Sequence, residues 1–270
     1  MNIYLDYPVV PLPRHGYGKP PHAKIQQLME NERGTYKKYL EETMKHVEAL
    51  AAISLDEPQS EKEPFYRNNW LPLLDGVAIY TFLAKHKPAR YVEVGSGNST
   101  KFARKAIRDL NLSTKITSID PYPRAEIDCL CDEVIRQTLE TVPVEYFQQL
   151  EPGDILFIDS SHRSFTNSDV TVAFLEVLPM LKPGVIIQVH DIFLPYDYPH
   201  EYMQLFYSEQ YLLASYLLGG SKLKLLLPTF YVAEDRELFS MLDQLYLKLG
   251  THSTNPICEG CSCWLEVQSD

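Results

Sequence analysis

Four residues of types that can exchange protons or bind metal ions lie at the ends of two apolar stretches of the sequence. Asp159 ends the stretch P-G-D-I-L-F-I-D, and His162 comes three residues later. His190 and Asp191 end the stretch V-I-I-Q-V-H-D. Both stretches have the length and apolar character of buried strands. Because open α/β sheets bind ligands at the carboxyl ends of their strands, we expect these four side chains to share one site.

Histidine is well suited to remove a proton near neutral pH, so His162 is our first candidate for a general base and His190 the second. Asp159 and Asp191 would orient the imidazoles or the substrate. Asp159, His190 and Asp191 also offer ligands for a divalent metal, and the two histidines with one carboxylate could equally form a non-haem iron triad, but the spacing selects neither. We therefore assign no metal ligand. Each residue also has a structural alternative, since such groups often cap turns or brace loops.

A glycine turn follows another short apolar strand, in the sequence R-Y-V-E-V-G-S-G-N-S-T at residues 90–100. Gly95 and Gly97 permit a tight bend and a close approach of a ligand to the backbone. A dinucleotide site has a third glycine where this chain has Thr100. Glu93 within the strand suits a cationic ligand, and the start of the next helix suits an anionic one. S-adenosylmethionine (SAM) carries both kinds of charge, while a dinucleotide site or a plain structural turn stays open.

An acidic residue also ends the next apolar run, K-I-T-S-I-D, at Asp120. A carboxylate at the end of the second strand hydrogen-bonds ribose hydroxyls in nucleotide-binding sheets. A helix-capping role is the alternative. Together with Glu93 and the glycines, Asp120 favours a ribose-containing ligand.

The order of apolar runs predicts the fold around these residues. Strands are expected near residues 91–94, 115–120, 131–137, 152–159, 185–191, 222–227 and 261–267. Helices are expected at 22–55, with a possible break at Gly34, and near 75–85, 101–110, 140–150, 165–181, 202–218 and 234–249. Alternating strands and helices predict a mainly parallel α/β sheet with helices on both faces. We place an N-terminal arm and helical cap at residues 1–64 and the ligand-binding domain at 65–270.

Composition narrows the possible partners. The formal net charge of −11 and the lack of a Lys/Arg-rich run exclude a typical nucleic-acid-binding chain, which favours a small-molecule substrate. We find no apolar run long enough to span a membrane and no signal peptide. These features predict a cytoplasmic protein. The aromatic N-terminal arm is either a dimer contact or part of a lid, so a homo-oligomer stays open.

Five cysteines suggest reduced thiols rather than a disulfide framework, since their number is odd and low for 270 residues. Three of them form the pattern C-x-x-C-x-C at Cys258, Cys261 and Cys263. His252 is the nearest fourth ligand for a zinc site, but the pattern lacks the paired C-x-x-C spacing of known zinc folds. We expect buried thiols near the last strand.

With these motifs in view, the chain resembles the class I SAM-dependent methyltransferase superfamily, and most closely the group labelled methyltransferase domain 24. The matching pieces are Y-V-E-V-G-S-G-N-S-T, I-T-S-I-D-P, G-D-I-L-F-I-D-S-S-H-R-S-F and L-K-P-G-V-I-I-Q-V-H-D-I-F-L-P-Y-D-Y-P, in the order of the family. They extend over roughly residues 70–267. The resemblance implies a Rossmann-like sheet of seven strands with an antiparallel last strand.

The resemblance also implies roles for individual residues. Glu93, Gly95, Ser96 and Gly97 would line the methionine part of SAM, and Asp120 would meet its ribose. Asp159, His162, His190 and Asp191 would lie beside the transferred methyl group. The acid that many relatives use to bind adenine is not obvious here, where the chain offers Gln137, Thr138 and Glu140.

The resulting hypothesis is O-methylation of a small-molecule hydroxyl with SAM as the methyl donor and S-adenosylhomocysteine (SAH) as the product. A divalent metal stays open as a second cofactor. One alternative is an NAD(P)-dependent oxidoreductase, which would share the sheet and Asp120. Another is a protein that binds SAM or SAH without catalysing methyl transfer.

Overall fold

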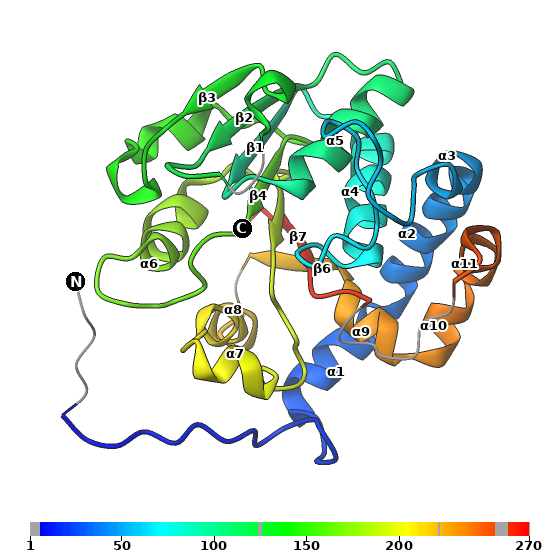
Figure 1. Cartoon of the computed structure of the whole chain (residues 1–270). Coiled ribbons are helices and arrows are strands. Elements are labelled where there is room, and N and C mark those ends of the chain that lie inside the picture. Colours follow the sequence, from blue (N-terminus) through cyan, green and yellow to red (C-terminus); the bar gives the residue numbers. More distant parts are fainter. Residues whose placement is uncertain (1–5, 124–125, 221, 252–258, 270) are drawn as a thin grey trace.

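A seven-stranded sheet organises the computed structural model, which describes residues 6–123, 126–220, 222–251 and 259–269 (Figure 1). Its strands are β1 (Arg90–Val94), β2 (Lys115–Ile119), β3 (Glu133–Ile135), β4 (Ile155–Ile158), β5 (Ile186–Val189), β6 (Leu223–Pro228) and β7 (Cys263–Val267). The order across the sheet is β3-β2-β1-β4-β5-β7-β6. β7 runs antiparallel to both β5 and β6, and the pairs from β3 to β5 are parallel. The predicted Rossmann-like sheet with an antiparallel last strand is confirmed.

The register of the parallel strands aligns the residues that follow them. Val94 of β1 is level with Ile119 of β2 and with Ile158 of β4, and Ile158 is level with Val189 of β5. The residue that follows the end of each strand therefore lies at the same edge of the sheet. These residues are Gly95, Asp120, Asp159 and His190. The strand order also reverses at β1, which makes this edge the usual place for a ligand.

Helices cover both faces of the sheet, with α2, α4 and α5 on one face and α6 and α8 on the other (Figure 1). The helices before the sheet are α1 (Ala23–Asn31), α2 (Arg33–Lys45), α3 (Val47–Ala51) and α4 (Leu73–His86). Those that follow are α5 (Asn98–Asp109), α6 (Asp169–Val172), α7 (His200–Gln204), α8 (Glu209–Leu218), α9 (Thr229–Glu234), α10 (Arg236–Ser240) and α11 (Asp243–Leu249). Shorter turns are η1 (Asp128–Leu130), η2 (Leu139–Thr141), η3 (Val144–Gln149), η4 (Ala173–Val177) and η5 (Leu178–Met180).

Several predicted helices are divided in the structure. The break in the first one falls at Glu32, and Gly34 lies inside α2, so the break expected at Gly34 was wrong. The helix predicted for 140–150 consists of η2 and η3, because Pro143 between them has no N–H to donate. The helix predicted for 202–218 is divided near Phe206, whose φ of 58° is incompatible with a right-handed helix.

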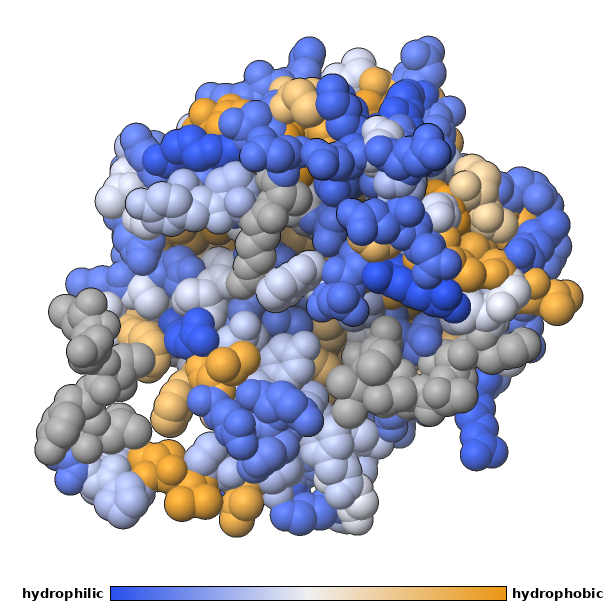
Figure 2. Space-filling view, in the orientation of Figure 1, coloured by the Kyte–Doolittle hydropathy of each residue, from blue (hydrophilic) through white to orange (hydrophobic). Residues whose placement is uncertain are grey.

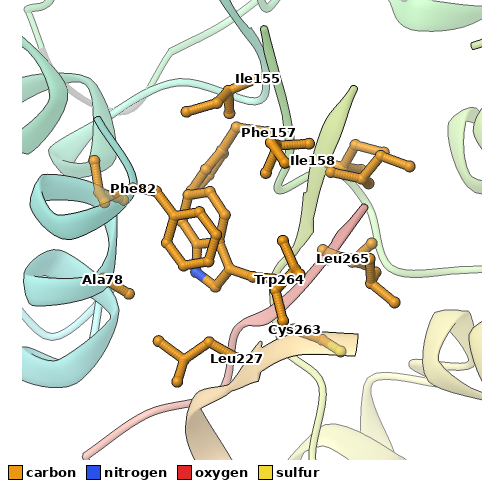
Figure 3. Packing of buried hydrophobic residues seen from close by; sticks show 14 of the residues in the cluster. Ala78, Phe82, Ile155, Phe157, Ile158, Leu227, Cys263, Trp264 and Leu265 are labelled. Carbon is orange, nitrogen blue, oxygen red and sulfur yellow. The ribbon is translucent and has the colours of Figure 1, made fainter. Parts of the chain in front are cut away.

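The core joins the N-terminal helices to the sheet. Trp264 of β7 stacks on Phe82 of α4 with ring centroids 3.9 Å apart (Figure 3). Phe82 stacks in turn on Tyr39 of α2, at 4.5 Å. Fully burying side chains of this size stabilises a fold by about 1.5–3 kcal/mol each. Residues of the predicted helical cap therefore share a core with the sheet, and the boundary after residue 64 stays a prediction.

The N-terminal arm crosses the surface without a helix. The carboxylate Oδ2 of Asp197 accepts hydrogen bonds from the backbone N–H groups of Arg14 (2.6 Å) and His15 (2.8 Å), which anchors the arm. Polar side chains cover most of the face in Figure 2, and apolar ones gather along its lower edge, near the course of the arm in Figure 1. Val10 and Leu12 are exposed apolar residues of this arm. Within the described residues, no helix is both long and apolar enough to cross a membrane.

Candidate active site

A cavity of about 470 Å³ opens at the carboxyl ends of β1, β2 and β4. Its wall comes from the glycine turn and the start of α5, the ends of β2 and β4, η2, and the segment before α4. The lining residues are Glu57, Phe65, Asn68, Trp70, Leu71, Val94, Gly95, Ser96, Gly97, Asn98, Ser99, Lys101, Ile119, Asp120, Pro121, Tyr122, Thr138, Leu139, Glu140, Asp159, Ser160 and Asp169. This volume is typical of a small-molecule or cofactor site.

The two glycines of the turn have different roles. Gly95 has a φ of +81°, and a Cβ atom there would lie 1.7 Å from the carbonyl oxygen of Asp159. A Cβ atom on Gly97 would meet nothing within 4 Å, although Gly97 lines the cavity. The fold therefore requires a glycine at 95, whereas the small size of Gly97 leaves room for a ligand.

Asp120 joins the end of β2 to the glycine turn. Its Oδ2 atom accepts the backbone N–H of Ser96 at 2.8 Å, and its Oδ1 atom accepts that of Tyr122 at 2.8 Å. Each carboxylate oxygen has a second lone pair, so Asp120 can also accept bonds from ligand hydroxyls. The structure thus places Asp120, Gly95, Ser96 and Gly97 around one cavity, and their contact with a cofactor stays a prediction.

Glu93 lies behind the turn and is not among the residues that line the cavity. Its carboxyl group accepts the hydroxyl of Thr100, and Thr100 Oγ1 accepts the backbone N–H of Gly97 at 3.2 Å. Burial raises the pKa of Glu93 to about 8, against the opposing effect of hydrogen bonds from Ser99 and Thr100. Glu93 therefore supports the turn through Thr100, a link absent from the sequence analysis. Its predicted contact with the cofactor stays a prediction.

The structure brings the four predicted catalytic residues together. Oδ1 of Asp159 lies 3.2 Å from Nε2 of His162 and 3.4 Å from Nδ1 of His190. Oδ2 of Asp191 lies 3.4 Å from the same nitrogen of His162. Of the four, Asp159 lines the cavity, and the two histidines and Asp191 are buried behind it.

Glu209 completes the surroundings of His162. Its Oε2 atom lies 2.9 Å from Nδ1 of His162, and the residue is fully buried at the start of α8. The sequence analysis missed this acid, because 47 residues separate it from His162. The signal available in the sequence was a carboxylate at the start of a largely apolar helix.

Charge in this cluster stabilises the protonated histidines. Burial alone would lower the pKa of His162, but Asp191, Asp159 and Glu209 raise it well above its ordinary value. Burial would likewise raise the pKa of Asp159, but His190 and His162 hold it well below its ordinary value. Asp159 is therefore an ionised group on the cavity wall with imidazolium groups behind it.

The adenine end of the predicted ligand site is only partly as expected. Thr138 and Glu140 line the cavity, and Gln137 is not among its lining residues. The exposed rings of Trp70 and Tyr122 stand at the cavity as further candidates for stacking on a base. In the sequence, Tyr122 carried no signal beyond its place after Asp120.

Two groups of side chains have the donor atoms to hold a metal ion. Asp159, His162 and Asp191 form one, and Asp75, His190 and Cys261 form the other, each with donor atoms within 4.8 Å of one another. The sequence grouped His190 with the two aspartates, whereas the structure groups His162 with them. The first group suits a hard divalent cation. Cys261 and Cys263 are buried, as expected, while Cys258 and His252 lie outside the described residues.

Residues 92–192 match the family model described as a methyltransferase domain, of the group numbered 24. The matched residues extend from β1 to the residues just after β5. An uncharacterised protein of Archaeoglobus fulgidus is 29% identical over 144 residues, which are 48% of this chain and 63% of that protein. The chain thus matches less than two thirds of the length of this relative.

Solved structures of methyltransferases show weaker similarity to this chain. The O-methyltransferase TomG of Streptomyces achromogenes, in complex with SAM, aligns with a TM-score of 0.47 and 15% identity, covering 80% of this chain and 92% of TomG. The SAH-bound methyltransferase PaMTH1 of Podospora anserina aligns with a TM-score of 0.44 and 13% identity, covering 94% and 100%.

Proposed function

We propose that this chain transfers a methyl group from SAM to a hydroxyl group of a small molecule and releases SAH. One observation carries the proposal: Gly97, Asp120 and Asp159 face a single cavity at the carboxyl edge of the sheet. The methyltransferase domain at residues 92–192 supports the same cofactor class. Within this cavity, the N–H groups at the start of α5 would bind the SAM carboxylate and Asp120 the ribose hydroxyls.

Asp159 is the residue best placed to meet the acceptor, because its carboxylate is ionised and lines the cavity. SAM supplies an electrophilic methyl group, so the acceptor oxygen must lose its proton as it attacks. We propose that Asp159 holds this hydroxyl and that His162, 3.2 Å behind it, takes up the proton. Before it can do so, His162 must release to solvent the proton that its carboxylate neighbours stabilise, and the cationic SAM beside Asp159 favours this release, because a nearby positive charge lowers the pKa of the imidazolium. Positioning of the two reactants supplies a further part of the acceleration.

The first experiment is calorimetric titration with SAM and SAH. We expect binding in the wild type and a loss of at least about 10-fold in affinity in Asp120→Asn, because a neutral amide is a poorer acceptor for ribose hydroxyls. Asp109→Asn is the matched control, since Asp109 ends α5, pairs with Lys105 and is not a lining residue. Equal affinity in both variants would contradict the role of Asp120. No binding of SAM or SAH by the wild type would contradict the proposed function.

The two alternatives make different predictions in the same assays. A dinucleotide-dependent oxidoreductase would bind NAD or NADP in place of SAM. A non-catalytic SAM-binding protein would bind SAH and show no methyl transfer to any hydroxyl acceptor, and His162→Ala would change no rate. Screening acceptors with and without a chelator tests whether turnover depends on a divalent metal.

A further inference from the structure

We propose that Asp75, His190 and Cys261 bind a zinc ion behind the wall of the cavity. Asp75 lies in the first turn of α4, His190 follows β5, and Cys261 precedes β7. All three are at most 2% exposed. The site joins three distant segments and is separate from the glycine turn that faces the proposed cofactor.

The donor atoms have the separations that a tetrahedral zinc ion requires. Cys261 Sγ lies 3.5 Å from His190 Nε2 and 3.4 Å from Asp75 Oδ2, and these last two atoms are 3.4 Å apart. Bond lengths of about 2.3 Å to sulfur and 2.0–2.1 Å to nitrogen or oxygen place tetrahedral ligands about 3.3–3.6 Å from one another. One thiolate, one imidazole and one carboxylate are also a donor set that zinc accepts.

Asp191 lies beside the site but is not placed as a ligand together with His190 Nε2, because its Oδ1 atom is 3.7 Å from His190 Nδ1, the ring nitrogen that faces away from the proposed ion. The same Oδ1 atom lies 3.3 Å from Cys261 Sγ, while the Oδ2 atom of Asp191 faces His162. Three protein ligands would leave the fourth position of the tetrahedron to a water molecule. Zinc binding would displace the proton of the Cys261 thiol.

The second ring nitrogen of His190, Nδ1, is also consistent with zinc bound at Nε2. Its Nδ1 atom is buried and lacks a hydrogen bond of good geometry, and its nearest acceptor is Asp159 Oδ1 at 3.4 Å. Histidines that bind zinc through Nε2 usually direct Nδ1–H to a carboxylate, which fixes the tautomer and the ring orientation. Asp159 is in the position of that carboxylate.

Charge gives a further reason for a cation. The connected cluster holds four carboxylates, from Asp75, Asp159, Asp191 and Glu209, against two imidazoles. Burial raises the pKa of Glu209, so its carboxyl group is left out of the count of charges. Even with both imidazoles protonated, Asp75, Asp159 and Asp191 then leave one negative charge in excess among the described residues of this cluster. Uncompensated buried charge is strongly unfavourable, and a divalent cation supplies the missing compensation.

Zinc at this position would occupy the Nε2 lone pair of His190. His190 could not then serve as a general base, which leaves His162 for that role. The ion would also connect the start of α4 and the segment before β7 to the end of β5. We therefore expect its removal to destabilise the domain as well as to disturb Asp159.

Cobalt substitution tests the site, because a thiolate bound to Co²⁺ gives a charge-transfer band in the near ultraviolet and strong visible bands when tetrahedral. The full-length protein is stripped with a chelator and titrated with Co²⁺ and then with Zn²⁺ against a chromophoric competitor. We expect one equivalent with the sulfur band in the wild type and in Cys263→Ser, whose thiol is also buried. Cys261→Ala should lose the band and bind zinc at least about 100-fold more weakly, since even residues beyond the first ligands contribute 10–100-fold.

Absence of the sulfur band from folded wild-type protein would overturn the proposal without reference to any variant. Persistence of the band in Cys261→Ala would overturn it as well. A cobalt spectrum without sulfur character would place the ion among Asp159, His162 and Asp191, and thus also contradict the proposed site. Circular dichroism of each protein shows that the comparison concerns folded chains. SAM titration is a separate measurement, so the two proposals can fail independently.

Discussion

The backbone at Gly95 lies so close to Asp159 that a Cβ atom on Gly95 would stand 1.7 Å from the carbonyl oxygen of Asp159. This contact joins the turn after β1 to the carboxyl end of β4. It fixes the distance between the glycine turn and the carboxylate that we propose meets the methyl acceptor. The two parts of the site are therefore positioned by backbone contact rather than by flexible side chains.

Replacing each glycine of the turn should have a different effect. Gly95→Ala combines a positive φ with a clash against backbone, and we expect it to lower the free energy of unfolding by at least about 3 kcal/mol. Gly97→Ala should lose much less stability, because its Cβ atom has free space. It should nevertheless weaken SAM binding at least about 10-fold, since one methyl group in a fitted pocket is worth about 1–3 kcal/mol. Urea denaturation and calorimetry measure the two effects, and similar stabilities for the two variants would contradict the assignment.

Asp159→Asn should lower kcat by at least about 100-fold, the usual contribution of a group that manages a proton. The amide keeps the shape of the side chain but removes the charge that faces the acceptor and His162. Ser160→Ala is the matched control, because Ser160 also lines the cavity and its hydroxyl is buried without a hydrogen-bond partner. We expect this control to retain kcat within about 3-fold, the scale of a surface-like change. Comparable losses in both variants would show a general disturbance of the cavity.

Glu93 makes the stability of the protein depend on pH. Its pKa is about 8 in the folded protein and 4.5 ordinarily, so the folded chain keeps a proton that the unfolded chain releases. Stability therefore falls as pH rises from 4.5 to 8, by roughly 5 kcal/mol at most. Glu93→Gln should lack this decline, which urea denaturation at several pH values measures against the wild type.

The same variant tests whether Glu93 meets the cofactor. A carboxyl group that is protonated and lies behind the turn does not attract a cation, so we expect Glu93→Gln to bind SAM within about 3-fold of wild type, or less than 1 kcal/mol. A 10-fold loss with unchanged stability would instead support direct contact between Glu93 and SAM.

His86 gives stability the opposite dependence on pH. Burial, followed by the charge of Lys85, lowers its pKa from 6.5 to about 4, and its Nε2 atom lies 2.9 Å from the hydroxyl of Tyr39. Below pH 6.5 the unfolded chain takes up a proton that the folded chain resists down to pH 4. His86 therefore lowers the free energy of unfolding by up to about 3 kcal/mol as pH falls from 6.5 to 4. Between pH 7 and pH 4.5, His86→Gln should lose less free energy of unfolding than the wild type. Urea denaturation at several pH values measures this loss, and parallel plots of stability against pH for the two proteins would refute the prediction.

Much of this site was predictable from local pattern. Short apolar runs that end in Gly95, Asp120, Asp159 and His190 predicted strands, and parallel strands bring their carboxyl ends to one edge of a sheet. Hydrophobic periodicity likewise predicted the positions of the strands and long helices. These features are local, so the chain alone determines them.

Tertiary structure decided which side chains reach the cavity. The motifs assigned both Glu93 and Asp159 to the ligand site, yet Glu93 is buried behind the turn and Asp159 lines the cavity. The direction of a side chain at a strand end depends on the backbone of the neighbouring strand, which periodicity does not encode. Breaks within helices were also unpredictable, since a left-handed residue such as Phe206 is selected by packing.

Contacts between segments far apart in the sequence also depended on the tertiary structure. Asp75 and Cys261 are 186 residues apart, and His162 and Glu209 are 47 apart, yet both pairs meet. Sequence spacing carries no information on such pairs, because helices and the sheet determine which loops face each other. The chain alone therefore indicated a methyltransferase sheet with a reactive edge, and the fold determined which acids surround each histidine.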